Sequence, residues 1–118
     1  MKEVFAPISP SELFNKLSVL RVTSLSAIEP TEPALFKVEE ERLRSIADTH
    51  IPMSQELRPL LDQLHEINID LISVRYDIAQ CEHHGDFGPA FIALARAEHA
   101  TRNERNRVLG LIDNSVKQ

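Results

Sequence analysis

Apolar residues recur every seven positions through the middle of the chain. A second apolar series follows the first by three residues, and the two series are Leu57, Leu64, Leu71 and Ile78, and Leu60, Ile67, Val74 and Cys81. This spacing is typical of the a and d positions of a coiled-coil seam. It predicts a long helix over residues 56–83, about 40 Å in length at 1.5 Å per residue.

A second long helix is predicted over 89–114, antiparallel to the first. Gly85 can adopt the left-handed conformation that ends a helix, and Pro89 suits the first position of the next one. The short turn between the two helices makes them neighbours. Gly110 lies inside the second helix, where glycine costs about 1 kcal/mol relative to alanine, so we expect another helix to approach it closely.

Two shorter helices are predicted before this hairpin. The first spans 9–26, where the Ser9 hydroxyl caps the Glu12 amide and the Glu12 carboxylate returns to the Ser9 amide. Residues 1–8 are expected to form an extended arm, and residues 30–33 a linker. The second short helix spans 33–48. Its expected buried positions are Leu35, Val38, Leu43 and Ile46.

These elements predict one all-α domain over 1–118, an up-and-down bundle of about four helices built on a long antiparallel hairpin. The hairpin is longer than the two short helices can cover. An apolar stripe left uncovered favours self-association, so we expect a homodimer or a complex with another protein.

Charge and composition narrow the choice of partners. The formal net charge is −5, whereas non-specific binding to nucleic acid or to an anionic membrane needs a basic surface. No apolar run approaches the ~20 residues of a membrane span, and the first residues lack the apolar core of a secretory signal. The single cysteine, Cys81, can form neither an internal disulfide nor a thiolate metal site. We therefore expect a cytoplasmic protein that binds no nucleic acid and no membrane.

One polar cluster is expected within the hairpin. Folding the hairpin about residue 87 places Arg75 near Glu98, and places Asn68 near Arg105 and Asn106. Paired arginines suit phosphate or carboxylate ligands, because the guanidinium group binds them through two hydrogen bonds. The alternative is a structural ion-pair cluster that sets the register of the hairpin. The candidate ligand-binding residues are Asn68, Arg75, Glu98, Arg102, Arg105 and Asn106.

Catalytic, cofactor and metal signatures are weak. Residues 82–86, Glu-His-His-Gly-Asp, could bind a divalent metal, but adjacent histidines point in different directions on a helix. The long helix is similar to the first helix of all-helical chorismate mutases, with Arg75 at the position of that family's helix arginine. Asp86 occupies the position where that family has a lysine. An aspartate there cannot help to bind the anionic substrate, so the group of cationic residues that the reaction needs is incomplete. We expect no catalytic residue, no metal and no cofactor.

Several segments resemble a small family of uncharacterised bacterial all-helical proteins. Residues 8–20 resemble its opening V-S-x-G-E-L-x-D-K-x-T-I-L, residues 68–82 its N-x-x-L-W-x-x-E-D-x-I-R-x-x-E, and residues 91–113 its F-I-x-L-A-R … N-D-E-R … I-N. The family's tryptophan is Ile72 here, and its acidic pair is Arg75 and Tyr76. The resemblance implies a helical fold and a setting near cell-envelope polysaccharide functions, but no activity.

Two functions are therefore open. The first is a non-enzymatic helical module that binds itself or another protein. The second is a small-molecule site for a phosphorylated sugar or nucleotide, or an enzyme linked to cell-envelope polysaccharide metabolism, built on the polar cluster of the hairpin.

Overall fold

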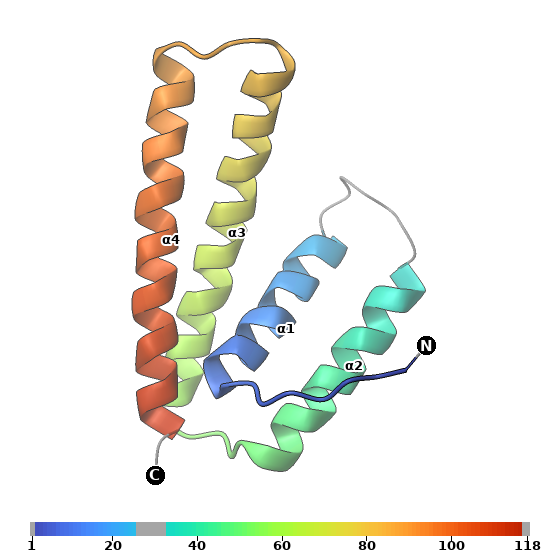
Figure 1. The fold of residues 1–118 in the computed structure, drawn as a ribbon. Helices are drawn as coiled ribbons and strands as arrows, with labels where there is room; N and C mark the ends of the chain where they lie inside the picture. The colour runs from blue at the N-terminus through green and yellow to red at the C-terminus, as the bar shows by residue number, and fades with distance from the viewer. Residues whose placement is uncertain (1, 26–32, 117–118) are drawn as a thin grey trace.

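The computed structural model describes residues 2–25 and 33–116 (Figure 1). Within these ranges the chain forms four α-helices and no strand, so the predicted all-α bundle is confirmed. The expected linker over 30–33 falls almost entirely outside the described residues. Each helix begins and ends within two residues of its predicted bounds. The helices are α1 Pro10–Leu25, α2 Pro33–His50, α3 Leu57–His83 and α4 Pro89–Val116.

The turn between α3 and α4 follows from its glycine and proline. Gly85 has φ 67°, a left-handed conformation that carries no penalty for a residue without a Cβ atom. Its N–H donates to the Glu82 carbonyl at 3.1 Å, and the Asp86 N–H donates to the Cys81 carbonyl at 2.8 Å. This pair of bonds is a Schellman motif, which satisfies two carbonyls at the end of α3. Pro89 then begins α4, as the sequence predicts.

The N-terminus of α1 is held by a local cap and by a residue from the far end of the chain. The Glu12 N–H donates to the Ser9 hydroxyl at 3.2 Å, as expected, but the Glu12 carboxylate accepts from that hydroxyl, at 3.2 Å, and not from the expected Ser9 amide. Asp113 of α4 accepts from the Ser11 N–H at 2.9 Å and from the Ser11 hydroxyl at 2.8 Å. The carboxylate therefore satisfies unpaired donors at the positive end of the α1 dipole.

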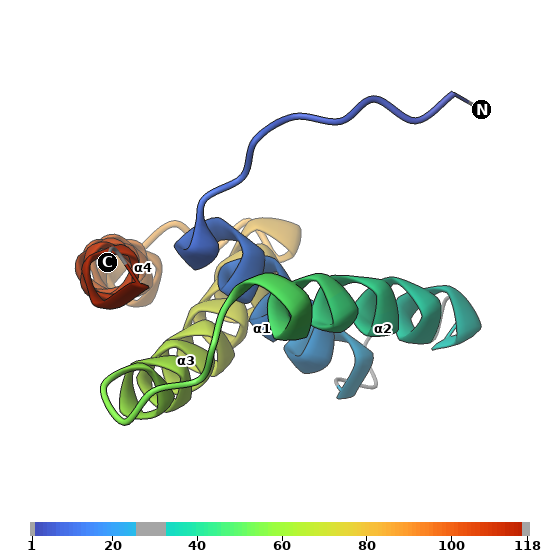
Figure 2. The same ribbon diagram turned by 90° about the horizontal axis from the view of Figure 1, so that it is seen from below.

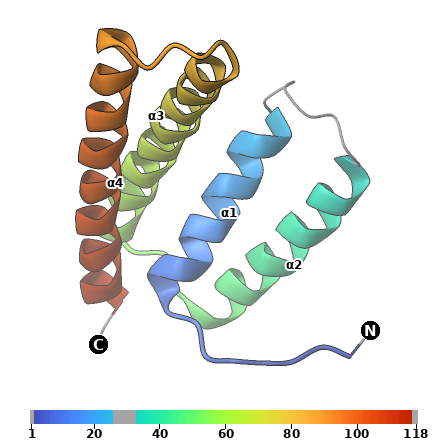
Figure 3. The ribbon, with the colours of Figure 1, turned by 45° about the horizontal axis from the view of Figure 1, so that its top comes forward.

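The four helices form a layered arrangement with α1 in the middle (Figure 3). In the described part of the chain, α1 packs against the three other helices, whereas the backbone of α2 approaches α1 alone. The extended arm leaves the start of α1 (Figure 2) and runs toward α2, where Glu3 lies 3.4 Å from Arg42. The core lies where α1 meets the hairpin on one side and α2 on the other. Its buried residues are Leu13, Phe14, Leu17, Leu43, Ala47, Leu57, Leu64, Val108 and Ile112.

The predicted buried face of α2 is wrong in part. Leu43 is buried, but Val38 is 62% exposed and Ile46 is exposed as well, while Ala47 is buried in their place. The side chain of Leu35 lies outside the described ones. Because α2 has one neighbouring helix, its buried stripe is narrower than the stripe of a helix inside a bundle.

The prediction that another helix approaches Gly110 closely is also wrong. Gly110 is exposed, and a Cβ atom added there would meet nothing within 4 Å. No helix in the described part of the chain uses its small size, so this glycine has no packing role that the structure explains.

The hairpin extends well beyond the end of α1 (Figure 1). Along α3, Leu57, Leu64 and Leu71 are almost completely buried, whereas Val74 and Ile78 further along the same seam are only half-buried. The radius of gyration is 16.3 Å, against about 13 Å for a compact domain of this length. The predicted seam therefore exists, but only its first half is covered by a third helix.

Candidate functional site

Three of the predicted site residues form an ion-pair cluster across the hairpin. A carboxylate oxygen of Glu98 lies 3.6 Å from an Arg75 guanidinium nitrogen and 3.7 Å from the Arg102 Nε atom. The hairpin register predicted from the sequence thus brings Arg75 and Glu98 together. Both distances exceed the ordinary length of a hydrogen bond, so these contacts are electrostatic.

Arg105 lies beside this cluster without a carboxylate of its own. Its Nε atom is buried and has no hydrogen-bond partner, and neither does the buried Oε1 atom of Glu98. Burial lowers the pKa of the Arg105 guanidinium, the nearby charges of Arg75 and Arg102 lower it further, and Glu98 opposes them. Three cations share one carboxylate here, which leaves an excess of two positive charges on a chain whose formal net charge is −5.

Asn68 and Asn106, the remaining two predicted residues, take no part in these ion pairs. Asn68 is almost completely buried, and its side-chain amide donates to the side-chain Oδ1 atom of Asn15 and to the Ser18 hydroxyl, each at 3.0 Å. The Ser18 hydroxyl also lies 3.2 Å from the Nδ1 atom of His65. These polar groups join α1 to α3, so Asn68 fixes the position of α1 on the hairpin. Asn106 is exposed on α4.

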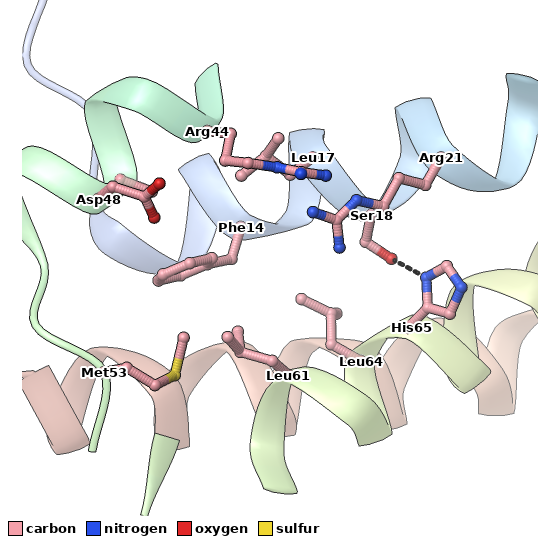
Figure 4. Close-up of a pocket in the computed structure, with 11 residues that line it drawn as sticks. Phe14, Leu17, Ser18, Arg21, Arg44, Asp48, Met53, Leu61, Leu64 and His65 are labelled. Carbon is pink, nitrogen blue, oxygen red and sulfur yellow. Dashed lines mark hydrogen bonds between the residues drawn. The ribbon is translucent and has the colours of Figure 1, made fainter. Parts of the chain in front are cut away.

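A pocket that the sequence analysis missed lies between α1, α2 and α3 (Figure 4). Its volume is about 310 Å³, near the lower end of the ~300–1,000 Å³ range of small-molecule sites. No local motif marks the pocket, because its walls come from three helices and from the segment before α3. Its lining residues are Phe14, Leu17, Ser18, Arg21, Arg44, Ala47, Asp48, Met53, Leu61, Leu64 and His65.

The pocket combines an apolar floor with a cationic end. Leu17 and Leu64 are buried beneath it. The guanidinium groups of Arg21 and Arg44 point toward one another above Leu17 and beside Ser18 (Figure 4). Both arginines pair with the same carboxylate, that of Glu40, at 3.6 Å and 2.5 Å.

The two histidines and the cysteine singled out in the sequence lie at the distal end of α3. The described residues contain no group of three or more His, Cys, Asp or Glu that could hold a metal ion. In the segment considered for a metal, the rings of His83 and His84 contact one another edge to face at 5.3 Å. Cys81 is a free, half-buried cysteine in the distal part of the seam.

Comparison of the chain with protein-family models, with curated proteins and with solved structures finds no match. Among the described helices, none is sufficiently long and apolar to cross a membrane. The function is therefore inferred from the geometry of the chain itself.

Proposed function

We propose that the protein is a non-enzymatic self-association module, in which the part of the α3–α4 hairpin beyond α1 binds a second copy. The observation that carries the proposal is the exposure of large apolar side chains on this part of the hairpin. The exposed fractions are 45% for Ile69, 44% for Tyr76, 58% for Phe87 and 49% for Ile92.

Helical spacing relates the exposed α3 residues to the face that α1 covers. Asn68 and His65 contact α1 through Ser18. Ile72 follows Asn68 by four residues, and Ile69 follows His65 by four, so both continue this face past the end of the contact. The side of α3 that α1 buries thus continues with two isoleucines, Ile69 exposed and Ile72 half-buried.

The same argument applies to α4. Asp113 contacts α1 through Ser11. Counting back from Asp113 in steps of seven, four, seven and three residues leads to Asn106, Arg102, Ala95 and Ile92, which share its face within about one residue's rotation. Ala95 and Ile92 are the apolar members of this series and both are exposed, so the distal half of α4 adds apolar surface on which a further helix could pack.

The surface area supports an interface of ordinary size. The accessible surface is 8499 Å², whereas a compact monomer of 13.4 kDa exposes about 6,500 Å². The difference is about 2,000 Å² for each chain, part of which belongs to the extended arm. A standard interface removes ~1,600 Å² in total from both partners, or about 800 Å² from each, which is less than this excess.

Charge suggests how two copies would align. Arg75, Ala79 and Glu82 follow one another at helical spacing on this face, and the two charged side chains are exposed. If the α3 helices of two copies pair antiparallel about Ala79, Arg75 of each copy lies within one residue of the position opposite Glu82 of the other. The small side chain of Ala79 permits close approach at the symmetry axis.

The test is the molar mass in solution, measured by light scattering over a range of protein concentrations. The unaltered chain is expected to be a dimer, and Ile92→Glu is expected to shift it to a monomer with unchanged helical circular dichroism. Val38→Glu is the matched control, because Val38 is exposed on α2, away from the hairpin. A monomeric unaltered chain at all concentrations, or equal effects of both substitutions, would contradict the proposal.

A charge exchange tests the alignment separately. Arg75→Glu and Glu82→Arg should each weaken the dimer, because each places like charges opposite one another. The double variant should restore it. If the double variant is weaker than either single one, the antiparallel pairing about Ala79 is wrong.

A further inference from the structure

The pocket between α1, α2 and α3 arises from the way α2 is attached. The backbone of α2 approaches α1 and, within the described ranges, neither helix of the hairpin. The space between α2 and α3 is consequently a wedge with α1 at its base. This wedge is separate from the distal part of the hairpin and from the interface proposed above.

The apolar part of the pocket is built from side chains whose burial is incomplete. Phe14 and Ala47 are buried in the core, but Leu61 is only half-buried and Met53 is 52% exposed at the edge. Apolar surface that lines a concave site gains free energy when a ligand removes it from water. The pocket therefore favours a ligand with an apolar body.

The cationic end of the pocket, formed by Arg21 and Arg44, favours a negatively charged group on the ligand. Two guanidinium groups converge there, and like charges at short range repel one another (Figure 4). Glu40 offsets one of these charges and does not line the pocket. Asp48 lies at the opposite end, beyond Phe14 (Figure 4). The Glu40 carboxylate already bridges the two guanidinium groups, so an anionic group in the pocket would accept hydrogen bonds from their remaining N–H donors and neutralise the second positive charge.

We infer that this pocket binds a small amphipathic anion. Its carboxylate or phosphate group lies between Arg21 and Arg44, and its apolar body lies along Phe14, Leu61 and Met53. Such a ligand contacts both α2 and α3 and fills the wedge between them. Binding therefore anchors α2, which otherwise depends on α1.

The first experiment is a calorimetric titration of the full chain with decanoate, with decanol as the uncharged control of equal chain length. Decanoate is expected to bind one site per chain, and decanol at least about tenfold more weakly, since charge-assisted hydrogen bonds contribute ~1.5–3 kcal/mol. No saturable binding of decanoate, or equal affinity for the two compounds, overturns the inference.

The location is tested with a reporter. The chain has no tryptophan, so Met53→Trp places a single indole at the edge of the pocket, on a side chain that is half exposed. Decanoate is expected to shift the fluorescence emission of this indole. The shift should saturate at the same decanoate concentration as the heat of binding in the calorimetric titration. If the heat of binding saturates but the fluorescence emission does not change, decanoate binds elsewhere, and the assignment of this pocket as the binding site is overturned.

The arginines are tested against a neighbouring arginine on α2. The double variant Arg21→Gln and Arg44→Gln should weaken decanoate binding at least about tenfold. Arg42→Gln is the control, because Arg42 pairs with Glu3 of the arm and does not line the pocket. Circular dichroism confirms folding of each variant. Equal affinity of the double variant and the control contradicts the inference.

Discussion

The bond between Asp113 and Ser11 links residues that are 102 positions apart, and it gives a sharp test of how α1 is held on the hairpin. Asp113→Ala removes an acceptor from two charge-assisted hydrogen bonds and leaves the buried Ser11 N–H without a partner. Each hydrogen bond to a charged group contributes ~1.5–3 kcal/mol. Because the carboxylate is half-buried, solvent screens part of this contribution, and we expect a loss of about 2–4 kcal/mol.

Asp113→Asn separates the charge from the hydrogen bonds. The amide oxygen can still accept from the Ser11 N–H, and the hydroxyl can rotate to accept from the amide nitrogen. The variant then loses the interaction of a full charge with the N-terminus of α1, which contributes ~0.3–1 kcal/mol, and the bonds weaken. We expect a loss of about 1–2 kcal/mol.

Urea unfolding followed by circular dichroism measures both losses as shifts in the free energy of unfolding. Asp62→Asn is the control, since Asp62 is exposed on α3, and it should stay within about 0.5 kcal/mol of the unaltered protein. A double-mutant cycle with Ser11→Ala should give a coupling energy of at least about 0.5 kcal/mol. Additive losses in that cycle, or a loss for Asp113→Ala no larger than the control's, would refute the role assigned to this carboxylate.

Three further changes test the core, the helix interior and the ion-pair cluster. Leu71→Ala should lower the free energy of unfolding by ~2–5 kcal/mol, because Leu71 is 1% exposed; a loss below that range in urea titration argues against this burial. Gly110→Ala should raise the thermal midpoint through a gain of up to ~1 kcal/mol, since the added Cβ atom meets open space, and a lower midpoint would show a contact there. Arg105→Met should stabilise the chain at low salt by relieving the repulsion from Arg75 and Arg102, with the gain shrinking as salt is added; a salt-independent loss would contradict this account.

The sequence predicts the ends of the helices because the signals there are local. Ser9, Gly85 and Pro89 act on the backbone within a few residues, and the structure places each of them as expected. The register of the hairpin likewise follows from one short turn, so the sequence alone predicts that Arg75 lies near Glu98.

The failed predictions concern contacts with helices whose position the sequence does not reveal. The helical pattern predicts that Val38 is buried and that a helix approaches Gly110. In the described part of the chain, Val38 is 62% exposed and a Cβ atom added at Gly110 would meet open space. The amide of Asn68 donates to Asn15 and Ser18 of α1, a contact that the register of the hairpin does not reveal. A helical period indicates that one face is buried, but not which element buries it.

The sequence by itself thus determined the four helices, their caps and the antiparallel hairpin, since hydrophobic period and turn chemistry act over short distances. Tertiary structure alone decided that α1 covers half of the hairpin, that α2 rests on α1, and that Arg21, Arg44 and His65 line one pocket. Those arrangements depend on the distances and angles between whole helices. Such geometry is set by side-chain packing summed over many residues, and no single segment of the chain encodes it.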